Sequence, residues 1–329
     1  MIENIPDNLK KIKICDLSAA ANCNFKCKMC FFWRPQKNDG QTMSISDWKK
    51  LILQLEEFFG PDLLINISGP GEVLLLKGIE ELLLAAGRKF RVSINSNGYV
   101  IDDTAAKIIT DNIESISISL DGVSARTHDY IRGMPGSYSA AVLAIERLRK
   151  KSKTLIITVS TVILDYNLDE VIDLVNWIER SEVNGIIFQA VSLPNNIAYD
   201  PMWFKNEFKC LWPQDTEKVR TVMDKLIEYK SQGSKIVNPV KQLECFKEYF
   251  LNPQLHIKKL RCEVDNVLKI GSCGDIKICD FSQPIGNVKI SPLKEILASE
   301  LAQEERLKAY ECKSPCHLLV NCFHDNGGE

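Results

Sequence analysis

Between Lys11 and Val191, short apolar runs alternate with segments whose apolar residues have the spacing of a helix. Runs rich in isoleucine, valine and leucine that end at glycine, asparagine or aspartate are typical of strands. We expect six strands, at 11–21, 63–68, 91–95, 116–120, 155–164 and 185–191. Apolar residues three and four positions apart predict helices between them, at 44–59, 79–88, 102–110, 139–151 and 168–180.

Repeated strand–helix units favour parallel βαβ pairing, and right-handed crossovers curl such units into a barrel or partial barrel. We therefore predict an α/β fold, a partial (β/α)6 barrel, with an open doubly wound sheet as the alternative. Ligand sites in both folds lie at the carboxyl ends of the strands. The first four strands are followed there by cysteines, Gly69-Pro-Gly-Glu72, Ser96-Asn-Gly98 and Asp121-Gly122. The sequence thus predicts one ligand pocket at this edge, with a long loop carrying Asp121 to Gly133 beside it.

The strand–helix pattern breaks after Pro194. Residues 194–238 form an aromatic, turn-rich insertion with a helix at 217–230, which either packs on the core or covers the substrate; another helix is expected at 240–250. We assign 1–240 to the core and 241–329 to a small α+β domain with strands at 267–270 and 275–278. Apolar burial alone is too small to stabilise such a domain, so a bound metal is expected there.

Composition is that of an ordinary soluble protein, with 45% hydrophobic and 26% charged residues in 329. The net charge of −2 gives no reason to expect nucleic acid or a membrane surface as a partner. No apolar run is long enough to span a bilayer and no signal peptide is evident, so a cytoplasmic protein is expected. Twelve cysteines in such a protein indicate metal ligands more than disulfides.

Three cysteines lie within eight residues directly after the first predicted strand, as Cys23-x3-Cys27-x2-Cys30. Thiolates are soft ligands that suit zinc or an iron–sulfur cluster. A structural zinc site needs a fourth ligand, and no cysteine or histidine follows until His128. Three ligands on one loop instead leave one coordination position of the metal site open for substrate chemistry. A zinc site remains the alternative.

The Cys-x3-Cys-x2-Cys spacing resembles the signature of the radical S-adenosylmethionine (SAM) superfamily. The resemblance implies that Cys23, Cys27 and Cys30 hold a [4Fe–4S] cluster whose fourth iron binds the amino and carboxylate groups of SAM. It also implies the open (β/α)6 barrel of that family.

Further motifs resemble the SAM-binding segments of the same family. Gly69-Pro70-Gly71-Glu72 is similar to its Gly-Gly-Glu motif, with proline in place of one glycine. Ser119 and Asp121 match its fourth-strand motif, and Arg132 matches an arginine that pairs with the SAM carboxylate. The resemblance implies this set of SAM-binding residues: Phe32, Gly71, Glu72, Asn97, Ser119, Asp121, Arg132, Ser160 and Gln189.

The C-terminal cysteines resemble the SPASM or twitch extension of radical SAM enzymes, which holds auxiliary clusters. A full SPASM domain has seven cysteines and two clusters, whereas five match here, which implies one auxiliary [4Fe–4S] cluster. The expected ligands are Cys262, Cys279, Cys312, Cys316 and Cys322, of which four bind, with Cys273 and His324 as further candidates. A zinc site is the alternative.

Family resemblance implies reductive cleavage of SAM to a 5′-deoxyadenosyl radical, with electrons from a flavodoxin- or ferredoxin-type reductant. Hydrogen abstraction from a small-molecule, carbohydrate or peptide substrate would follow, and the auxiliary cluster suggests net oxidation. The few residues before the first strand favour a small-molecule or carbohydrate substrate, or a peptide recognised by another protein. One alternative is an epimerase with a thiol hydrogen donor, for which Cys210, Cys245 and Cys273 are candidates. Another is a non-catalytic iron–sulfur carrier or metal-binding protein.

Overall fold

In the computed structural model, one nine-stranded sheet runs in the order β6-β5-β4-β3-β2-β1-β7-β8-β9. The structure describes residues 9, 11–34, 42–194, 200–253, 266–312 and 316–321. The strands are β1 (Ile14–Ser18), β2 (Leu64–Ser68), β3 (Arg91–Ser96), β4 (Ser115–Ser119), β5 (Ile156–Ile163), β6 (Gly185–Ala190), β7 (Val267–Ile270), β8 (Asp275–Lys277) and β9 (Gly286–Asn287). All six core strands are parallel, and their spatial order follows the chain. The partial barrel is therefore confirmed and the doubly wound alternative is wrong.

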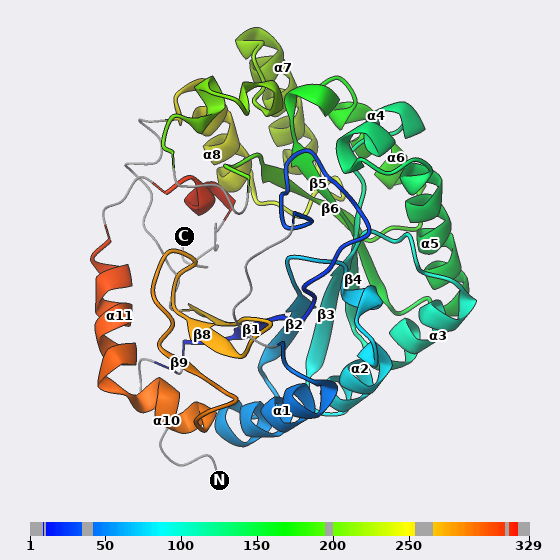
Figure 1. Ribbon diagram of the computed structural model, residues 1–329. Coiled ribbons are helices and arrows are strands. Elements are labelled where there is room, and N and C mark those ends of the chain that lie inside the picture. Colours follow the sequence, from blue (N-terminus) through cyan, green and yellow to red (C-terminus); the bar gives the residue numbers. More distant parts are fainter. Residues whose placement is uncertain are drawn as a thin grey trace.

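Helices cover the outside of this curved sheet, as Figure 1 shows for α1, α2, α3 and α5. Their bounds are α1 (Ile45–Phe59), α2 (Ile79–Gly87), α3 (Asp103–Asn112), α4 (Ala125–Arg132), α5 (Ser137–Lys151), α6 (Val171–Arg180), α7 (Thr216–Ser231), α8 (Val240–Leu251), α10 (Leu293–Ala298) and α11 (Glu300–Tyr310). The blue segment after β1 lies across the centre of the curve, away from these helices (Figure 1).

Side chains alternate along the core strands between a buried apolar face and a half-buried polar face. In β4, Ile116 and Ile118 are buried under the helices, whereas Ser115, Ser117 and Ser119 lie on the other face. Successive strand residues point to opposite faces of a sheet. The inner face of this partial barrel is thus polar, unlike the packed apolar interior of a closed eight-stranded barrel.

The segment from Asp121 to Gly133 is not the long loop that the sequence suggests, because α4 occupies most of it. Ser124 caps α4 by accepting a hydrogen bond from the backbone N–H of Thr127 at 3.2 Å. Glu170 accepts hydrogen bonds from the backbone N–H of Val123 at 2.8 Å and from the Ser124 hydroxyl at 3.1 Å. Only His128 and Ile131 of α4 are buried, so the segment carries a weak apolar signal.

The C-terminal strands join the core sheet directly. β7 pairs in parallel with β1, and β8 and β9 continue the sheet in antiparallel pairing. The predicted strands at 267–270 and 275–278 are therefore present, and α10 and α11 are additions that the sequence did not indicate. The domain division at residue 240 stays a prediction.

The aromatic insertion packs on the core. Trp203, Phe204 and Trp212 are buried, and their rings contact Tyr249 and Phe250 of α8 or one another. Of the two roles expected for these rings, packing is the one observed.

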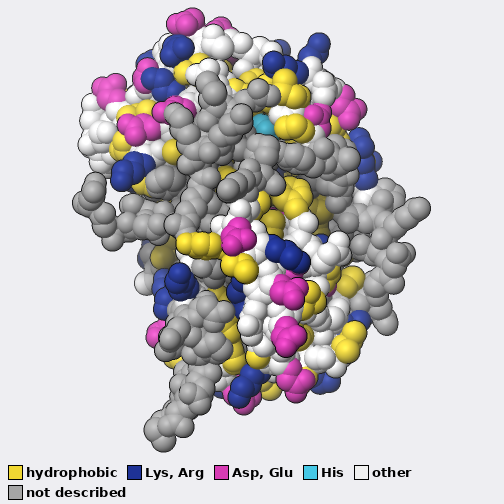
Figure 2. Space-filling view, turned by 90° about the vertical axis from the view of Figure 1, so that its left-hand side faces the viewer, with side chains coloured by type: hydrophobic (Ala, Val, Ile, Leu, Met, Phe, Trp, Pro, Cys, Tyr) yellow, Lys and Arg dark blue, Asp and Glu magenta, His cyan; other side chains and the backbone are white. Residues whose placement is uncertain are grey.

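Charges of both signs are mixed over the described part of the face seen in Figure 2. Within the described ranges, no helix combines the length and apolar character needed to cross a membrane.

Candidate functional site

The three-cysteine loop begins directly after β1, at the carboxyl edge of the core strands. Cys27 is buried, and Cys23 and Cys30 are half-buried. All three thiols are free of disulfides. The loop therefore presents three free sulfur ligands at the edge where the sequence predicts a ligand pocket.

Backbone hydrogen bonds hold the start of this loop against the segment after β2. The N–H of Gly71 donates to the carbonyl of Ala20 at 3.2 Å, and that of Glu72 donates to the carbonyl of Asn22 at 2.8 Å. A Cβ added at Gly71 would lie 2.0 Å from the Asn22 carbonyl oxygen. Glycine is therefore required here by the close approach of the cysteine loop itself.

The rest of the loop is held by the segments after β3 and β4. The side-chain amide of Asn97 donates to Asn24 Oδ1 at 2.8 Å. The backbone N–H of Lys28 donates to the Ile131 carbonyl at 2.9 Å. Gly133, with φ +62°, ends α4 so close to the loop that a Cβ would lie 2.4 Å from the Lys26 carbonyl oxygen. Three neighbouring strand ends thus position the cysteines.

Glu72 is 3% exposed, and its carboxylate joins the segments after β2 and β3. Oε1 accepts from the Ser96 hydroxyl at 2.9 Å and the Leu74 N–H at 3.2 Å, and Oε2 accepts from the Asn97 N–H at 2.7 Å. Burial raises the pKa of Glu72, and these three hydrogen bonds oppose the rise. A carboxylate has about four acceptor positions, so Glu72 can still accept a ligand donor.

Arg132 and Asp121 form a buried ion pair, with Arg132 Nε 2.6 Å from Asp121 Oδ2. The other carboxylate oxygen of Asp121 accepts from the Val162 N–H at 3.0 Å. The charge of Arg132 also lowers the pKa of Cys27, against the larger effect of burial, which raises it. Two predicted SAM-binding residues thus bind each other, beside one of the loop cysteines.

The donor set of the loop fits an iron–sulfur cluster. Burial raises the pKa of all three thiols, and Arg132 opposes the rise at each of them. Three free thiols on one short loop are the soft ligands that an iron–sulfur cluster requires.

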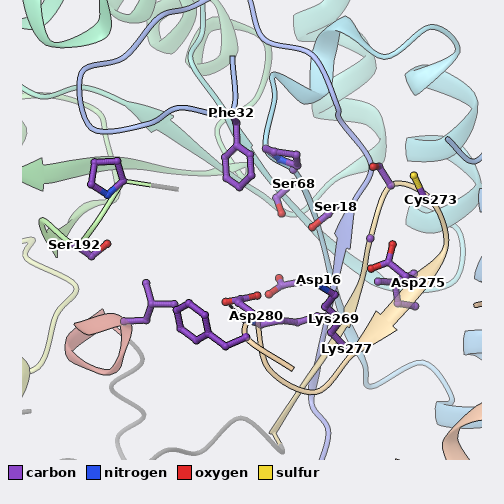
Figure 3. Close-up of a pocket in the computed structure, with 18 of the residues that line it drawn as sticks. Asp16, Ser18, Phe32, Ser68, Ser192, Lys269, Cys273, Asp275, Lys277 and Asp280 are labelled. Atoms are coloured by element: carbon purple, nitrogen blue, oxygen red, sulfur yellow. Dashed lines mark hydrogen bonds and ion pairs between the residues drawn. The ribbon is translucent and has the colours of Figure 1, made fainter. Parts of the chain in front are cut away.

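The remaining predicted SAM residues lie around the same edge. Ser119 and Ser160 are register partners on β4 and β5, and both are half-buried. Gln189 on β6 is exposed. Phe32 lines a cavity of about 640 Å³ (Figure 3).

A cavity of about 640 Å³ adjoins the cysteine loop. Phe32, Gly69 and Pro70 border it on the loop side, and the inner faces of β1, β7 and β8 border it on the other side. Charged side chains gather in this second wall, as Figure 3 shows: Asp16, Lys269, Asp275, Lys277 and Asp280. The cavity is large enough for a small-molecule or side-chain substrate.

A model described as the radical SAM superfamily matches residues 17–178, from the end of β1 into α6. The matched region contains the cysteine loop and the strand ends that hold it. This part of the chain, residues 17–178, belongs to the radical SAM superfamily.

Similar proteins include the Fe-coproporphyrin III synthase of Methanosarcina barkeri, 32% identical over 131 residues, and the mycofactocin maturase MftC of Mycolicibacterium smegmatis, 31% identical over 150 residues. The first match covers 39% of this chain and 32% of the relative, and the second covers 45% and 37%. The chain therefore matches well under half of the length of these relatives.

Solved structures extend the likeness in fold beyond this region. The structure of anSMEcpe with bound AdoMet matches with a TM-score of 0.68 and 19% identity, over 94% of this chain and 88% of the other. Streptococcus suis SuiB bound to precursor peptide SuiA matches with a TM-score of 0.66 and 15% identity, over 94% and 72%. The shared fold thus includes strands of the C-terminal part of this radical SAM protein.

The C-terminal cysteines are only partly within the described residues. Cys279 and Cys316 are half-buried and Cys312 is exposed. Cys262, Cys322 and His324 lie outside the described residues. Among the hydrogen-donor candidates, Cys273 lines the cavity, Cys210 is exposed in the insertion, and Cys245 lies half-buried on α8.

Sequence reasoning missed the charged wall of the cavity. Asp16 is the only charged residue between Ile14 and Ala21, in a strand that is otherwise apolar or small. A lone aspartate in such a strand indicates that its carboxylate faces a polar site. Lys269 and Asp280 carry no such signal, because nothing in the nearby sequence indicates that β7 pairs with β1.

Proposed function

We propose that this protein is a radical SAM enzyme that abstracts hydrogen from a substrate in the 640 Å³ cavity and oxidises it. One observation carries the proposal. The Cys23–Cys30 loop is hydrogen-bonded to the segments after β2, β3 and β4, and Phe32, two residues after Cys30, borders a cavity with charged side chains in its wall.

Cys23, Cys27 and Cys30 would hold the [4Fe–4S] cluster. When bound, the cluster and SAM supply a 5′-deoxyadenosyl radical, with electrons from a flavodoxin- or ferredoxin-type reductant. Glu72 keeps free acceptor capacity for the SAM amino group, and Ser119 and Ser160 offer hydroxyls on neighbouring strands. Arg132, already paired with Asp121, contributes positive charge near the thiolates.

Cys262 and Cys279, together with two of Cys312, Cys316 and Cys322, are proposed as ligands of one auxiliary [4Fe–4S] cluster. The reconstituted anaerobic protein should then contain about eight irons. Cys279→Ala should reduce this to about four without abolishing SAM cleavage. Four irons with stoichiometric zinc in the parent would instead support the zinc alternative.

Oxidation removes one hydrogen atom, one proton and one electron from the substrate; the 5′-deoxyadenosyl radical would take the hydrogen atom and the auxiliary cluster would accept the electron. Carboxylates that line the cavity are available to accept the proton. Epimerisation is the second candidate, because Cys273, a possible thiol hydrogen donor, also lines the cavity. A carrier without catalysis has no use for such a cavity.

Product mass in D2O separates the two reactions. A product two mass units lighter than the substrate supports oxidation. A product one unit heavier, with deuterium uptake that is lost in Cys273→Ala, supports epimerisation. Peptides are the first substrates to screen, because solved relatives of the same fold were obtained with peptides bound; small molecules and carbohydrates follow.

A further inference from the structure

Asp16 is a carboxylate on the inner face of β1, in the charged wall of the cavity. Its side chain accepts a hydrogen bond from Asn66 Nδ2 at 2.7 Å. These two residues are register partners on neighbouring strands, which fixes the pair on the sheet. Ser18 and Ser68 lie two residues further along the same strands, nearer the cysteine loop, and line the same cavity.

Within the described ranges, no direct ion pair joins Asp16 to a basic side chain. Lys269, its register partner on β7, lowers the pKa of Asp16 through its charge, but its ammonium group lies 2.8 Å from Asp280 Oδ2. Asp16 and Asp280 therefore share the positive charge of one lysine. In Figure 3, Asp16 and Asp280 lie together on the side of the cavity opposite Phe32.

The Asp16–Asn66 pair offers more acceptors than donors to the cavity. One of the two N–H groups of the Asn66 amide is used in the bond to Asp16. No donor in the described part of the chain is bonded to Asn66 Oδ1 or to the second oxygen of Asp16. Burial raises the pKa of Asp16, and the hydrogen bond from Asn66 and the charge of Lys269 only partly oppose this rise, so a bound cation would offset a remaining cost.

We propose that Asp16 and Asn66 form a subsite for a protonated primary amine of the substrate. An ammonium group supplies three donors and one positive charge, which match the acceptors of the pair and the negative charge left where Asp16 and Asp280 share one lysine. The cavity wall carries three carboxylates and two lysines, so a polyanionic substrate would meet a net negative surface. The inference rests on the proposed function, because it takes this cavity as the substrate site.

Simple probes test the subsite without a known substrate. The parent protein, reconstituted and bound to SAM, is titrated with n-butylammonium, n-butanol and butyrate, and binding is followed by ligand-observed NMR. A charge-assisted hydrogen bond should make butylammonium bind roughly 10- to 100-fold more tightly than butanol. Equal binding of the three probes, no binding, or a preference for butyrate would overturn the proposal.

Asp16→Asn, which keeps the shape of the side chain, should abolish the preference for butylammonium. The double variant Asp16→Asn/Asn66→Asp returns the negative charge to the pair and should restore most of the preference for butylammonium. Lys277→Gln, on the same wall, is the matched control and should leave the preference intact. Preference retained in Asp16→Asn, or lost in Lys277→Gln, contradicts the assignment.

A further probe separates two sources of the amine. Nα-acetyl-lysine amide presents an ammonium group on a peptide-like unit; tighter binding than butylammonium indicates a lysine side chain, and equal binding indicates a free amine. 5′-Deoxyadenosine is measured in the same samples. A parent protein that cleaves SAM without preferring the ammonium refutes only the subsite, whereas one that cannot cleave SAM refutes the proposed function.

Discussion

Arg132 and Asp121 form an ion pair of 2.6 Å between α4 and the end of β4, and the Asp121 side chain is fully buried in it. Both residues were expected to contact SAM, and the structure shows that they also support each other. Removing one charge leaves the other buried and unpaired, which destabilises by roughly 3–5 kcal/mol. Arg132→Ala should lose stability on this scale in urea unfolding, and Arg132→Ala/Asp121→Asn should recover part of it. A loss below about 1 kcal/mol in the single variant would show that the pair is not buried.

Ser119 tests SAM binding without disturbing that ion pair. It is half-buried at the carboxyl end of β4, beside Ser160. Ser119→Ala should weaken SAM binding by roughly 10-fold, the effect of one hydrogen bond, with unchanged iron content. Ser115→Ala, on the same face at the other end of β4, serves as the control. Equal SAM affinity of Ser119→Ala and the parent would remove Ser119 from the site.

Gly71→Ala should displace the cysteine loop, because the new Cβ would meet the Asn22 backbone at 2.0 Å. We expect the iron bound at the loop to fall sharply, measured as iron per chain after reconstitution. Gly136→Ala is the control, since a Cβ there meets nothing within 4 Å, although φ is +79°. That variant should lose only about 1 kcal/mol of stability. Normal iron content in Gly71→Ala would show that the loop adapts.

His128 should make stability depend on pH. It is fully buried, accepts a hydrogen bond from the Asp121 N–H, and burial lowers its pKa to about 4. The folded pKa lies below the unfolded value, so its contribution is complete above pH 6.5 and is lost as pH falls towards 4. Between pH 7 and pH 5 the loss should be roughly 2 kcal/mol. Urea unfolding should show a smaller decline in His128→Gln; equal declines would contradict the neutral buried histidine.

Much of the core could be predicted from the sequence, because its strands and most of its helices have strong apolar periodicity. The helix α4 could not, since only His128 and Ile131 are buried in it. Likewise, α11 buries only Ala302 and Glu305, while Leu301, Leu307 and Tyr310 are exposed, so its apolar residues do not form one buried face. Local pattern cannot reveal that β7 pairs with β1, because that contact joins residues some 250 positions apart.

The candidate site, too, could be predicted only in part from the sequence. Cysteine spacing and turn residues identified the loop and its neighbours, since ligand chemistry requires those residue types in short motifs. The cavity wall, by contrast, is assembled from β1, β7 and β8, and its charges acquire meaning only once the strands are paired.

SAM cleavage by loop-cysteine variants tests the central claim most directly. The parent protein and the variant with Cys23, Cys27 and Cys30 all changed to alanine are reconstituted anaerobically and incubated with SAM and dithionite. Cys245→Ala, on α8, is the matched control. The account predicts 5′-deoxyadenosine from the parent and from Cys245→Ala, and none from the triple variant. 5′-Deoxyadenosine from the triple variant at the parent's rate would contradict it.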